Sequence, residues 1–219
     1  MKERIKRGLE SFQKRTYKEK ETLYHDLETQ QHPDILFIGC SDSRVSPEIL
    51  LDADPGEVFV LRNIANSVPS VHAEVTDSTT MSGIEYAVLV LYVKMIIVCG
   101  HSNCGGCAAA LSGDQTLTKL PYTQHYLQPL EGLCKKVEAD AAGGTYVEKA
   151  KMMEELNVLE QLEHLREYVF IRERLAEGSL EIEGWRYAIG LGKVERYDEA
   201  ADRFMPIAAP QKAEPTRIS

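Results

Sequence analysis

Two short loops hold the residue types and spacings that could do metal chemistry. Residues 40–44 read CSDSR, and residues 101–107 read HSNCGGC. Cys40, His101 and Cys104 offer two thiolate sulfurs and one imidazole nitrogen, a soft ligand set that suits Zn2+. Three protein ligands leave one tetrahedral position open, which is typical of a catalytic zinc site rather than a structural one. We therefore expect these three residues to bind one zinc ion.

Two charged residues complete the first loop. Asp42 and Arg44 are two positions apart, close enough to pair or to orient a hydroxide formed at the metal. Arg44 can hold the carboxylate with two hydrogen bonds and keep it ionised. Zinc lowers the pKa of a water molecule that it binds, which provides a hydroxide nucleophile near neutral pH. We expect Asp42 and Arg44 to be the catalytic pair.

The remaining cysteines allow other interpretations. Cys104 and Cys107 form a CxxC pair that could be a thiol–disulfide motif, and Cys107 could instead be the fourth ligand of a closed structural site. The first interpretation leaves residues 40–44 without a role. The second requires Cys107 to turn toward the metal, whereas we expect it to lie on a helix and face away. The start of that helix favours the thiolate form of Cys104. Cys99 and Cys134 fit small buried side chains.

The elements that must position these loops alternate between strands and helices. Continuous apolar runs predict buried strands over residues 34–40, 57–62 and 95–100. Helices are predicted over residues 46–54, 78–92, 104–111, 126–140 and 146–176, the last with a break near residues 168–171. Residues 180–189 alternate apolar and polar side chains, as in a half-exposed edge strand. The pattern predicts an α/β fold with a mainly parallel central sheet flanked by helices. In such folds, ligands bind at the carboxyl ends of the strands.

Composition limits the classes of protein to consider. The chain has 219 residues, of which 43% are hydrophobic and 27% charged, and no stretch resembles a linker. We expect a single domain over residues 1–219, with an N-terminal helical arm (1–33), a zinc-binding α/β core (34–205) and an irregular tail (206–219). The net charge of −9 argues against nucleic acid as a partner. We find no signal-peptide pattern and no apolar run long enough for a membrane span, and the five cysteines fit a reducing compartment, so we expect a cytoplasmic protein.

The N-terminal arm has an amphipathic pattern. Ile5, Leu9 and Phe12 follow helical spacing among several lysines and arginines. We expect this apolar stripe to pack on the same domain or on a partner subunit, rather than on a membrane or RNA.

These motifs together resemble the beta class of carbonic anhydrases. The resemblance rests on residues 40–44 (CSDSR), 62–66 (RNIAN), 84–88 (IEYAV), 99–106 (CGHSNCGG) and 184–187 (GWRY), in the expected order along nearly the whole chain. It implies a four-stranded parallel core with an added edge strand. It also implies an N-terminal helix that wraps a second subunit, in a homodimer or a dimer of dimers with active sites at the interface.

The resemblance also implies a chemistry. Cys40, His101 and Cys104 would bind zinc, and zinc-bound hydroxide would attack CO2 to give bicarbonate, the reaction of a lyase. Asp42, paired with Arg44, would accept a hydrogen bond from that hydroxide, or would occupy the fourth zinc position in a resting state. The alternative is a non-catalytic, zinc-stabilised binding or redox module of the same fold. The intact pair of Asp42 and Arg44 favours the enzyme.

The sequence departs from some family members at two places. Those members have a regulatory bicarbonate pocket built from tryptophan, arginine and tyrosine, and the matching positions here are Phe37, Arg62 and Tyr187. Phe37 lacks the indole N–H that would help to bind the anion. We therefore expect Asp42 to stay paired with Arg44 at neutral pH, which leaves water or hydroxide as the fourth zinc ligand. Ala188 stands where many relatives have aspartate, and we attach no consequence to it.

Overall fold

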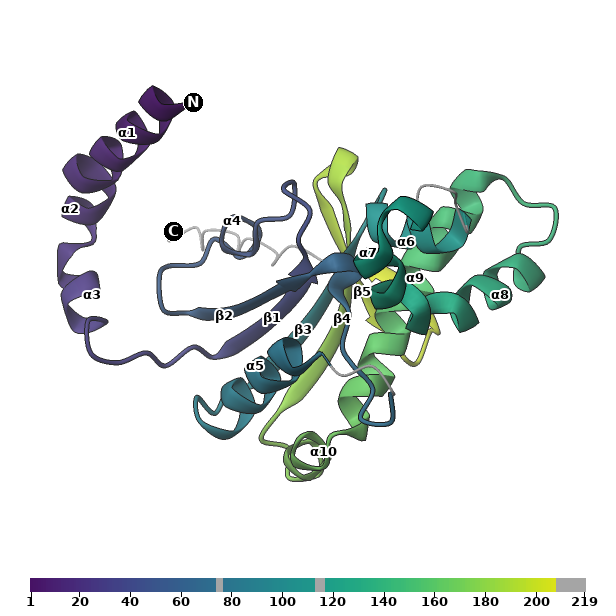
Figure 1. Cartoon of the computed structure of the whole chain (residues 1–219). Coiled ribbons are helices and arrows are strands. Elements are labelled where there is room, and N and C mark those ends of the chain that lie inside the picture. Colours follow the sequence, from purple (N-terminus) through teal and green to yellow (C-terminus); the bar gives the residue numbers. More distant parts are fainter. Residues whose placement is uncertain (74–76, 113–116, 208–219) are drawn as a thin grey trace, which may run out of the picture.

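A computed structural model describes residues 1–73, 77–112 and 117–207 of the chain (Figure 1). Its strands are β1 (Ile35–Cys40), β2 (Val58–Asn63), β3 (Met95–His101), β4 (Glu181–Ala188), β5 (Lys193–Asp198) and β6 (Arg203–Pro206). Its α-helices are α1 (Lys2–Ser11), α2 (Tyr17–Glu19), α3 (Glu21–Asp26), α4 (Pro47–Leu51), α5 (Ser78–Leu89), α6 (Gly105–Ser112), α7 (Pro121–Leu127), α8 (Glu131–Asp140), α9 (Tyr146–Glu167) and α10 (Val169–Ala176). A π-helical turn, Phe12–Thr16, joins α1 to α2, and 3-10 turns span Ile64–Asn66, Leu117–Lys119, Gln128–Leu130 and Ile189–Leu191. None of the helices in the described residues is long and apolar enough to cross a membrane.

One sheet connects all six described strands in the order β2-β1-β3-β4-β5-β6. The first four pair in parallel, and β5 and β6 add to β4 in antiparallel fashion. The expected parallel core with an added edge is therefore present, but the addition is a hairpin of two strands. The central strands β1 and β3 run parallel, so their carboxyl ends bring both predicted metal loops to the same edge of the sheet.

Alternate side chains of the central strands form separate cores on the two faces of the sheet. Leu36 and Ile38 of β1 pack with residues of α5, α9 and α10 on one face. Phe37, on the other face, packs with Ile97 and Cys99 of β3, and α4 adds partly buried leucines there. Burial on both faces explains why these strands read as continuous apolar runs.

Helix α9 approaches the sheet closely because two strand positions lack a side chain. A Cβ atom placed on Gly100 of β3 would lie 2.7 Å from Cγ2 of Val158, and one placed on Gly184 of β4 would lie 2.8 Å from Cγ1 of the same valine. Both distances are too short for real atoms. The two glycines therefore set the depth at which α9 lies, directly behind the strand that ends at His101.

The helices begin and end close to the predicted limits. Asp77 caps α5 by accepting hydrogen bonds from the backbone N–H groups of Thr79 and Thr80. The long helix predicted over residues 146–176 breaks at Tyr168, whose extended backbone separates α9 from α10. The helix predicted over residues 126–140 differs more, since it starts earlier at Pro121 and a 3-10 turn containing Pro129 interrupts it.

The prediction of an edge strand over residues 180–189 was wrong. Strand β4 lies inside the sheet, between β3 and β5. Glu181 is exposed, but two of the polar side chains of β4 have partners within the protein. Arg186 pairs with Glu154 of α9 and Glu195 of β5, and Glu183 accepts a hydrogen bond from Arg196. The predicted irregular tail begins within β6, at Pro206, and its residues 208–219 lie outside the described part of the chain.

The N-terminal arm is helical, as its amphipathic pattern predicted. Figure 1 shows α1 to α3 standing apart from the sheet and joined to β1 by an extended segment. Helix α1 has no buried residue, and Ile5, Leu9 and Phe12 are 56%, 58% and 40% exposed. Within this chain, therefore, the apolar stripe of the arm remains uncovered.

Candidate metal centre

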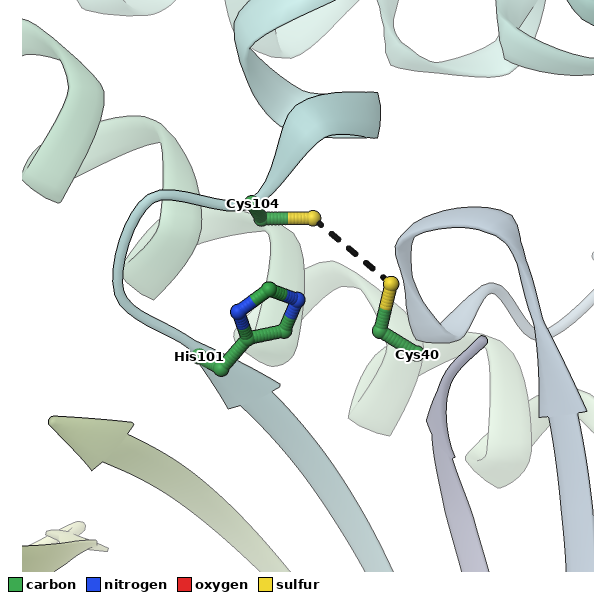
Figure 2. A group of neighbouring side chains, drawn as sticks. All are labelled: Cys40, His101 and Cys104. Carbon is green, nitrogen blue, oxygen red and sulfur yellow. Dashed lines mark hydrogen bonds between the residues drawn. The ribbon is translucent and has the colours of Figure 1, made fainter. Parts of the chain in front are cut away.

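The structure brings Cys40, His101 and Cys104 together at the carboxyl edge of the sheet (Figure 2). Cys40 is the last residue of β1 and His101 the last residue of β3, and these two strands are hydrogen-bonded neighbours. Cys104 follows three residues after His101 and immediately precedes α6. Strand pairing thus fixes two of the three side chains, and a tight turn brings the third to them.

The geometry of these three side chains fits a zinc ion. The Sγ atoms of Cys40 and Cys104 lie 3.9 Å apart, and two thiolates on one tetrahedral zinc, each bonded at about 2.3 Å, would lie about 3.8 Å apart. The ligand atoms of all three residues lie within 4.8 Å of one another. His101 Nδ1 is 3.0 Å from the carbonyl oxygen of Ser102, a contact that places the proton on Nδ1. Its Nε2 is buried and has no hydrogen-bond partner among the described residues, as expected of a nitrogen that binds metal.

Without a cation, both thiols are held in the neutral form. A hydrogen bond with the Cys104 thiol, followed by burial, raises the pKa of Cys40 to about 12. The pKa of Cys104 is likewise raised to about 12, first by a hydrogen bond with the Cys107 thiol. In the metal-free chain, neighbouring thiols and burial therefore outweigh any influence of the start of α6 on the pKa of Cys104. A metal ion must displace these protons in order to bind.

Asp42 and Arg44 form a bidentate ion pair beside the cluster. Arg44 Nε donates to Asp42 Oδ1 at 2.9 Å, and Nη2 donates to Oδ2 at 2.7 Å. These hydrogen bonds hold the pKa of Asp42 well below its usual range, so the carboxylate is ionised at neutral pH. Oδ2 is also 3.9 Å from Nε2 of His101. The carboxylate of Asp42, held in place by Arg44, therefore lies next to the group that could bind a metal.

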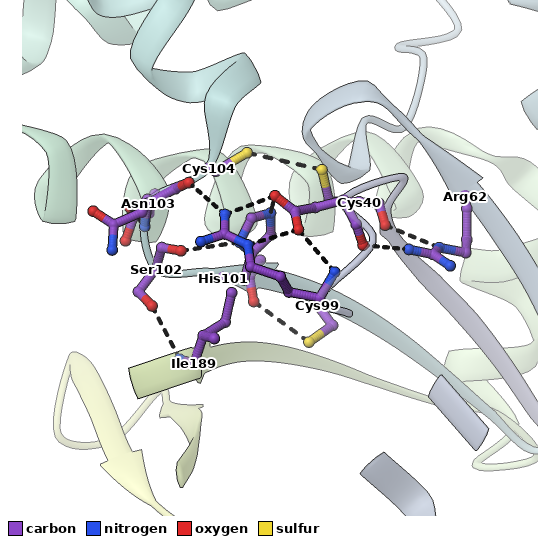
Figure 3. Close-up of polar contacts among 12 residues, drawn as sticks. Cys40, Arg62, Cys99, His101, Ser102, Asn103, Cys104 and Ile189 are labelled. Atoms are coloured by element: carbon purple, nitrogen blue, oxygen red, sulfur yellow. Dashed lines mark hydrogen bonds and ion pairs between the residues drawn. The ribbon is translucent and has the colours of Figure 1, made fainter. Parts of the chain in front are cut away.

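Arg62 holds the first loop in a way that the sequence did not reveal. Its Nε donates to the carbonyl oxygen of Cys40 at 3.0 Å, and its Nη2 donates to that of Asp42 at 2.6 Å (Figure 3). The resemblance pointed only to a regulatory role for this residue. Its place at the end of β2, next to β1, was the signal that could have indicated a contact with the loop after β1.

The other cysteines differ in how close they lie to the cluster. Cys99 is buried within β3, and Cys134 is partly buried on α8. Cys107 was expected to lie on a helix and face away from the site rather than to act as a fourth ligand. It lies on α6, where it is buried, and it is not part of the group that could hold a metal. Among the described residues, that group comprises only Cys40, His101 and Cys104.

Comparison with known proteins identifies the family. Residues 35–194 match the family model described as carbonic anhydrase. Carbonic anhydrase 1 of Escherichia coli O157:H7 is 38% identical over 202 residues, which cover 92% of this chain and 90% of that protein. The structure of the beta-carbonic anhydrase CcaA superposes with a TM-score of 0.89 at 33% identity, covering 94% of this chain and 98% of that one. One of two tetrameric beta-carbonic anhydrases from Sordaria macrospora gives a TM-score of 0.76 at 34% identity, covering 89% of this chain and 95% of that one. The chain belongs to the carbonic anhydrase family, in its beta class.

Proposed function

We propose that this enzyme hydrates carbon dioxide reversibly to bicarbonate and a proton, using one zinc ion per chain held by Cys40, His101 and Cys104. The observation that carries the proposal is the buried Cys-His-Cys group with an ionised carboxylate fixed next to it. Zinc at this place supplies a Lewis acid that makes water acidic enough to provide a hydroxide nucleophile at neutral pH.

Asp42 acts as a hydrogen-bond acceptor in this proposal. With its pKa well below the usual range, its carboxylate does not take up a proton at neutral pH and so is not a general base. Its Oδ2 instead accepts a hydrogen bond from the nucleophile and directs a lone pair toward carbon dioxide. Arg44 fixes the carboxylate through two hydrogen bonds, so that Asp42 remains oriented without becoming a ligand itself. The proton released by the reaction passes to buffer.

We also propose that the working form is a homodimer or a dimer of dimers in the cytoplasm. The uncovered stripe of Ile5, Leu9 and Phe12 on the arm needs a partner surface, and a related enzyme from Sordaria macrospora is described as tetrameric. All five cysteines are free thiols, which fits a reducing compartment. We propose no nucleic-acid partner, because the net charge of −9 would repel the phosphate backbone.

Stopped-flow measurement of carbon dioxide hydration, on protein of known zinc content, tests the proposal. We expect one zinc per chain and a rate that rises in proportion to the zinc content. The Cys134→Ala variant, altered at a cysteine on α8 away from the cluster, should match the wild type in both measurements. One zinc per chain with no hydration even at alkaline pH would instead favour the non-catalytic zinc-stabilised module.

A further inference from the structure

A buried carboxylate behind the second loop has two sets of partners. Glu154 of α9 is 4% exposed. Its Oε1 accepts a hydrogen bond from the backbone N–H of Asn103 at 2.7 Å. Its Oε2 accepts from Nε and Nη2 of Arg186 on β4, at 3.2 and 2.9 Å. One carboxylate therefore connects the metal-binding loop to an arginine in the middle of the sheet.

Asn103 is the residue through which this connection reaches the metal centre. It lies between His101 and Cys104 (Figure 3) and has a φ of +56°, a left-handed conformation that needs support from its surroundings. Glu154 holds its N–H, and Arg44 Nη2 donates to its carbonyl oxygen at 3.1 Å. The same Nη2 donates to Asp42 Oδ2. Contacts on both sides thus hold one loop residue in a strained conformation.

A role in stability alone is a weak explanation for such a pair. Removing two charges from water is costly, and apolar side chains of similar volume often replace a buried ion pair without loss of stability. Glu154 and Arg186 are both buried. What an apolar pair could not do is accept the hydrogen bond from Asn103. The contact with the loop is therefore the property that requires a carboxylate at this position.

We infer that Glu154 is a positioning residue for the metal centre. Through Asn103 it orients the loop that carries His101 and Cys104, and through the Asn103 carbonyl it orients the Arg44 guanidinium that holds Asp42. Arg186 donates two hydrogen bonds to the buried carboxylate and so keeps it in place beside the loop. This inference rests on the proposed zinc site, because its effect is on how well that site is arranged.

The Glu154→Gln variant tests the role with little change in shape. The amide replaces one of the two acceptor oxygens with an NH2 donor. Since Asn103 and Arg186 bind different oxygens, one of the two contacts must become a clash between donors. Loss of a partner that orients metal ligands typically lowers metal affinity or activity by about 10- to 100-fold. We expect a loss of that size in zinc affinity, and a matching loss in kcat rather than a rise in KM.

Glu195→Gln is the matched control. Glu195 lies on β5 and contacts Nη1 of Arg186 at 3.3 Å, so it belongs to the same ion-pair network without contacting the loop. The Glu195→Gln substitution should alter zinc affinity and kcat by less than about twofold. Glu154→Asp is a second variant for the case in which Glu154→Gln does not fold. It keeps the negative charge opposite Arg186 but is one methylene shorter, so it cannot reach both partners and should lose zinc affinity in the same direction.

The experiment compares full-length wild type with these variants. Zinc affinity is measured by competition with a chromophoric chelator. The absorption bands of the Co2+-substituted protein report the arrangement of the ligands. Thermal unfolding of the zinc-free chain shows whether each variant folds. The inference is supported if Glu154→Gln loses affinity and shifts the Co2+ bands while its zinc-free form unfolds near the temperature of Glu195→Gln. A wild type that binds zinc and hydrates carbon dioxide, with Glu154→Gln equal to Glu195→Gln, would overturn this inference alone. A wild type that binds no zinc would overturn the proposed function and this inference with it.

Discussion

Oδ2 of Asp42 lies 3.9 Å from Nε2 of His101. Hydrogen bonds from Nε and Nη2 of Arg44, one to each carboxylate oxygen, keep the carboxylate from turning further toward that nitrogen. The Asp42 carboxylate is therefore close to the predicted metal ligands while its oxygens accept hydrogen bonds from Arg44. Three hydrogen bonds from Arg44, one of them from its backbone N–H, hold the carboxylate in this position. They support the proposal that Asp42 orients the nucleophile rather than binding the metal ion.

The first prediction separates these two functions of a carboxylate. Asp42→Asn should retain one zinc per chain, because the ligand atoms are unchanged, and should lower kcat by about 100-fold or more, because the amide cannot stay fixed by Arg44 as a pure acceptor. Metal analysis and stopped-flow hydration measure the two effects. Ser43→Ala, in the same loop, should change neither. Loss of zinc from Asp42→Asn would show that the carboxylate is a ligand.

The second prediction concerns the ligands themselves. Cys40→Ser, His101→Ala and Cys104→Ser should each lose zinc and activity together, because each change removes a bond to the metal. Cys99→Ala and Cys107→Ala should keep their zinc. Metal content after dialysis against a chelator distinguishes the two groups. Cys107→Ala is the sharpest comparison because Cys107 is buried on α6, three residues after Cys104. A zinc-free Cys107→Ala protein would contradict the ligand assignment.

The third prediction concerns regulation by bicarbonate. Phe37 is buried among apolar side chains and has no polar hydrogen to offer, and Arg62 already donates to the carbonyl oxygens of Cys40 and Asp42. An anion site missing one donor is weakened by about tenfold or more, since hydrogen bonds to charged groups contribute about 1.5–3 kcal/mol. We expect the pH–rate curve to follow a single ionisation, and added bicarbonate not to change its steepness. A steep, cooperative curve would show that the pocket works without tryptophan.

The fourth prediction concerns assembly. Removal of residues 1–23 deletes the uncovered stripe of the arm while leaving the sheet and both metal loops in place. We expect the truncated protein to dissociate to smaller species at concentrations where the full chain is a dimer or larger. Sedimentation velocity over a dilution series measures this. Truncated protein of unchanged size would place the subunit interface elsewhere.

The fifth prediction concerns stability in acid. Glu167 Oε2 accepts hydrogen bonds from Ser70 Oγ at 2.6 Å and from the Val71 N–H at 2.9 Å. Burial is the largest single influence and would raise the pKa of Glu167, but these hydrogen bonds and the nearby histidines together lower it below the ordinary value of 4.5. A lowered folded-state pKa stabilises the protein above pH 4.5, and the stabilisation is lost as pH falls through that pKa.

The Glu167→Gln variant reports this contribution. At pH 7 its free energy of unfolding should be lower than that of the wild type by about 1 kcal/mol, the usual size for a hydrogen bond to a charged group that is partly exposed. The difference should shrink as pH falls below 4.5. Urea unfolding at several pH values measures it. Glu163→Gln, exposed on the same helix, should show no such trend, and a difference that grew in acid would reverse the assignment.

The meeting of Cys40, His101 and Cys104 could be predicted from the sequence, because the two motifs can be recognised locally and the strands before them can be read from the apolar pattern. Cys40 and His101 each end an apolar run, and parallel sheets bring such ends together. The break of the long helix at Tyr168 was also local, since β-type residues cluster there. The roles of Arg62 and Glu154 were not predictable in this way. Both depend on contacts with residues far along the chain, 22 residues away for Arg62 and 51 for Glu154.

The wrong prediction of an edge strand over residues 180–189 also comes from contacts between residues far apart in the chain. Alternating polar side chains are satisfied equally well by water or by ion pairs, and the sequence pattern is identical in the two cases. Only the fold shows that Arg186 has Glu154 and Glu195 as partners. Long-range pairing of charges is therefore what separates an internal strand from an edge strand here.

The parallel pairing of β1 with β3 has a consequence for the order of events during maturation. Neighbouring strands stand about 4.8 Å apart whether or not an ion is present, so the sheet delivers Cys40 and His101 to each other through backbone hydrogen bonds alone. A zinc ion bound as proposed would therefore find two of its ligands already in place and would not have to nucleate the fold, unlike in small zinc domains that are unfolded without metal. Removal and return of that ion would then be a reversible exchange on a folded chain, and zinc supply would set the number of active molecules rather than the number of folded ones.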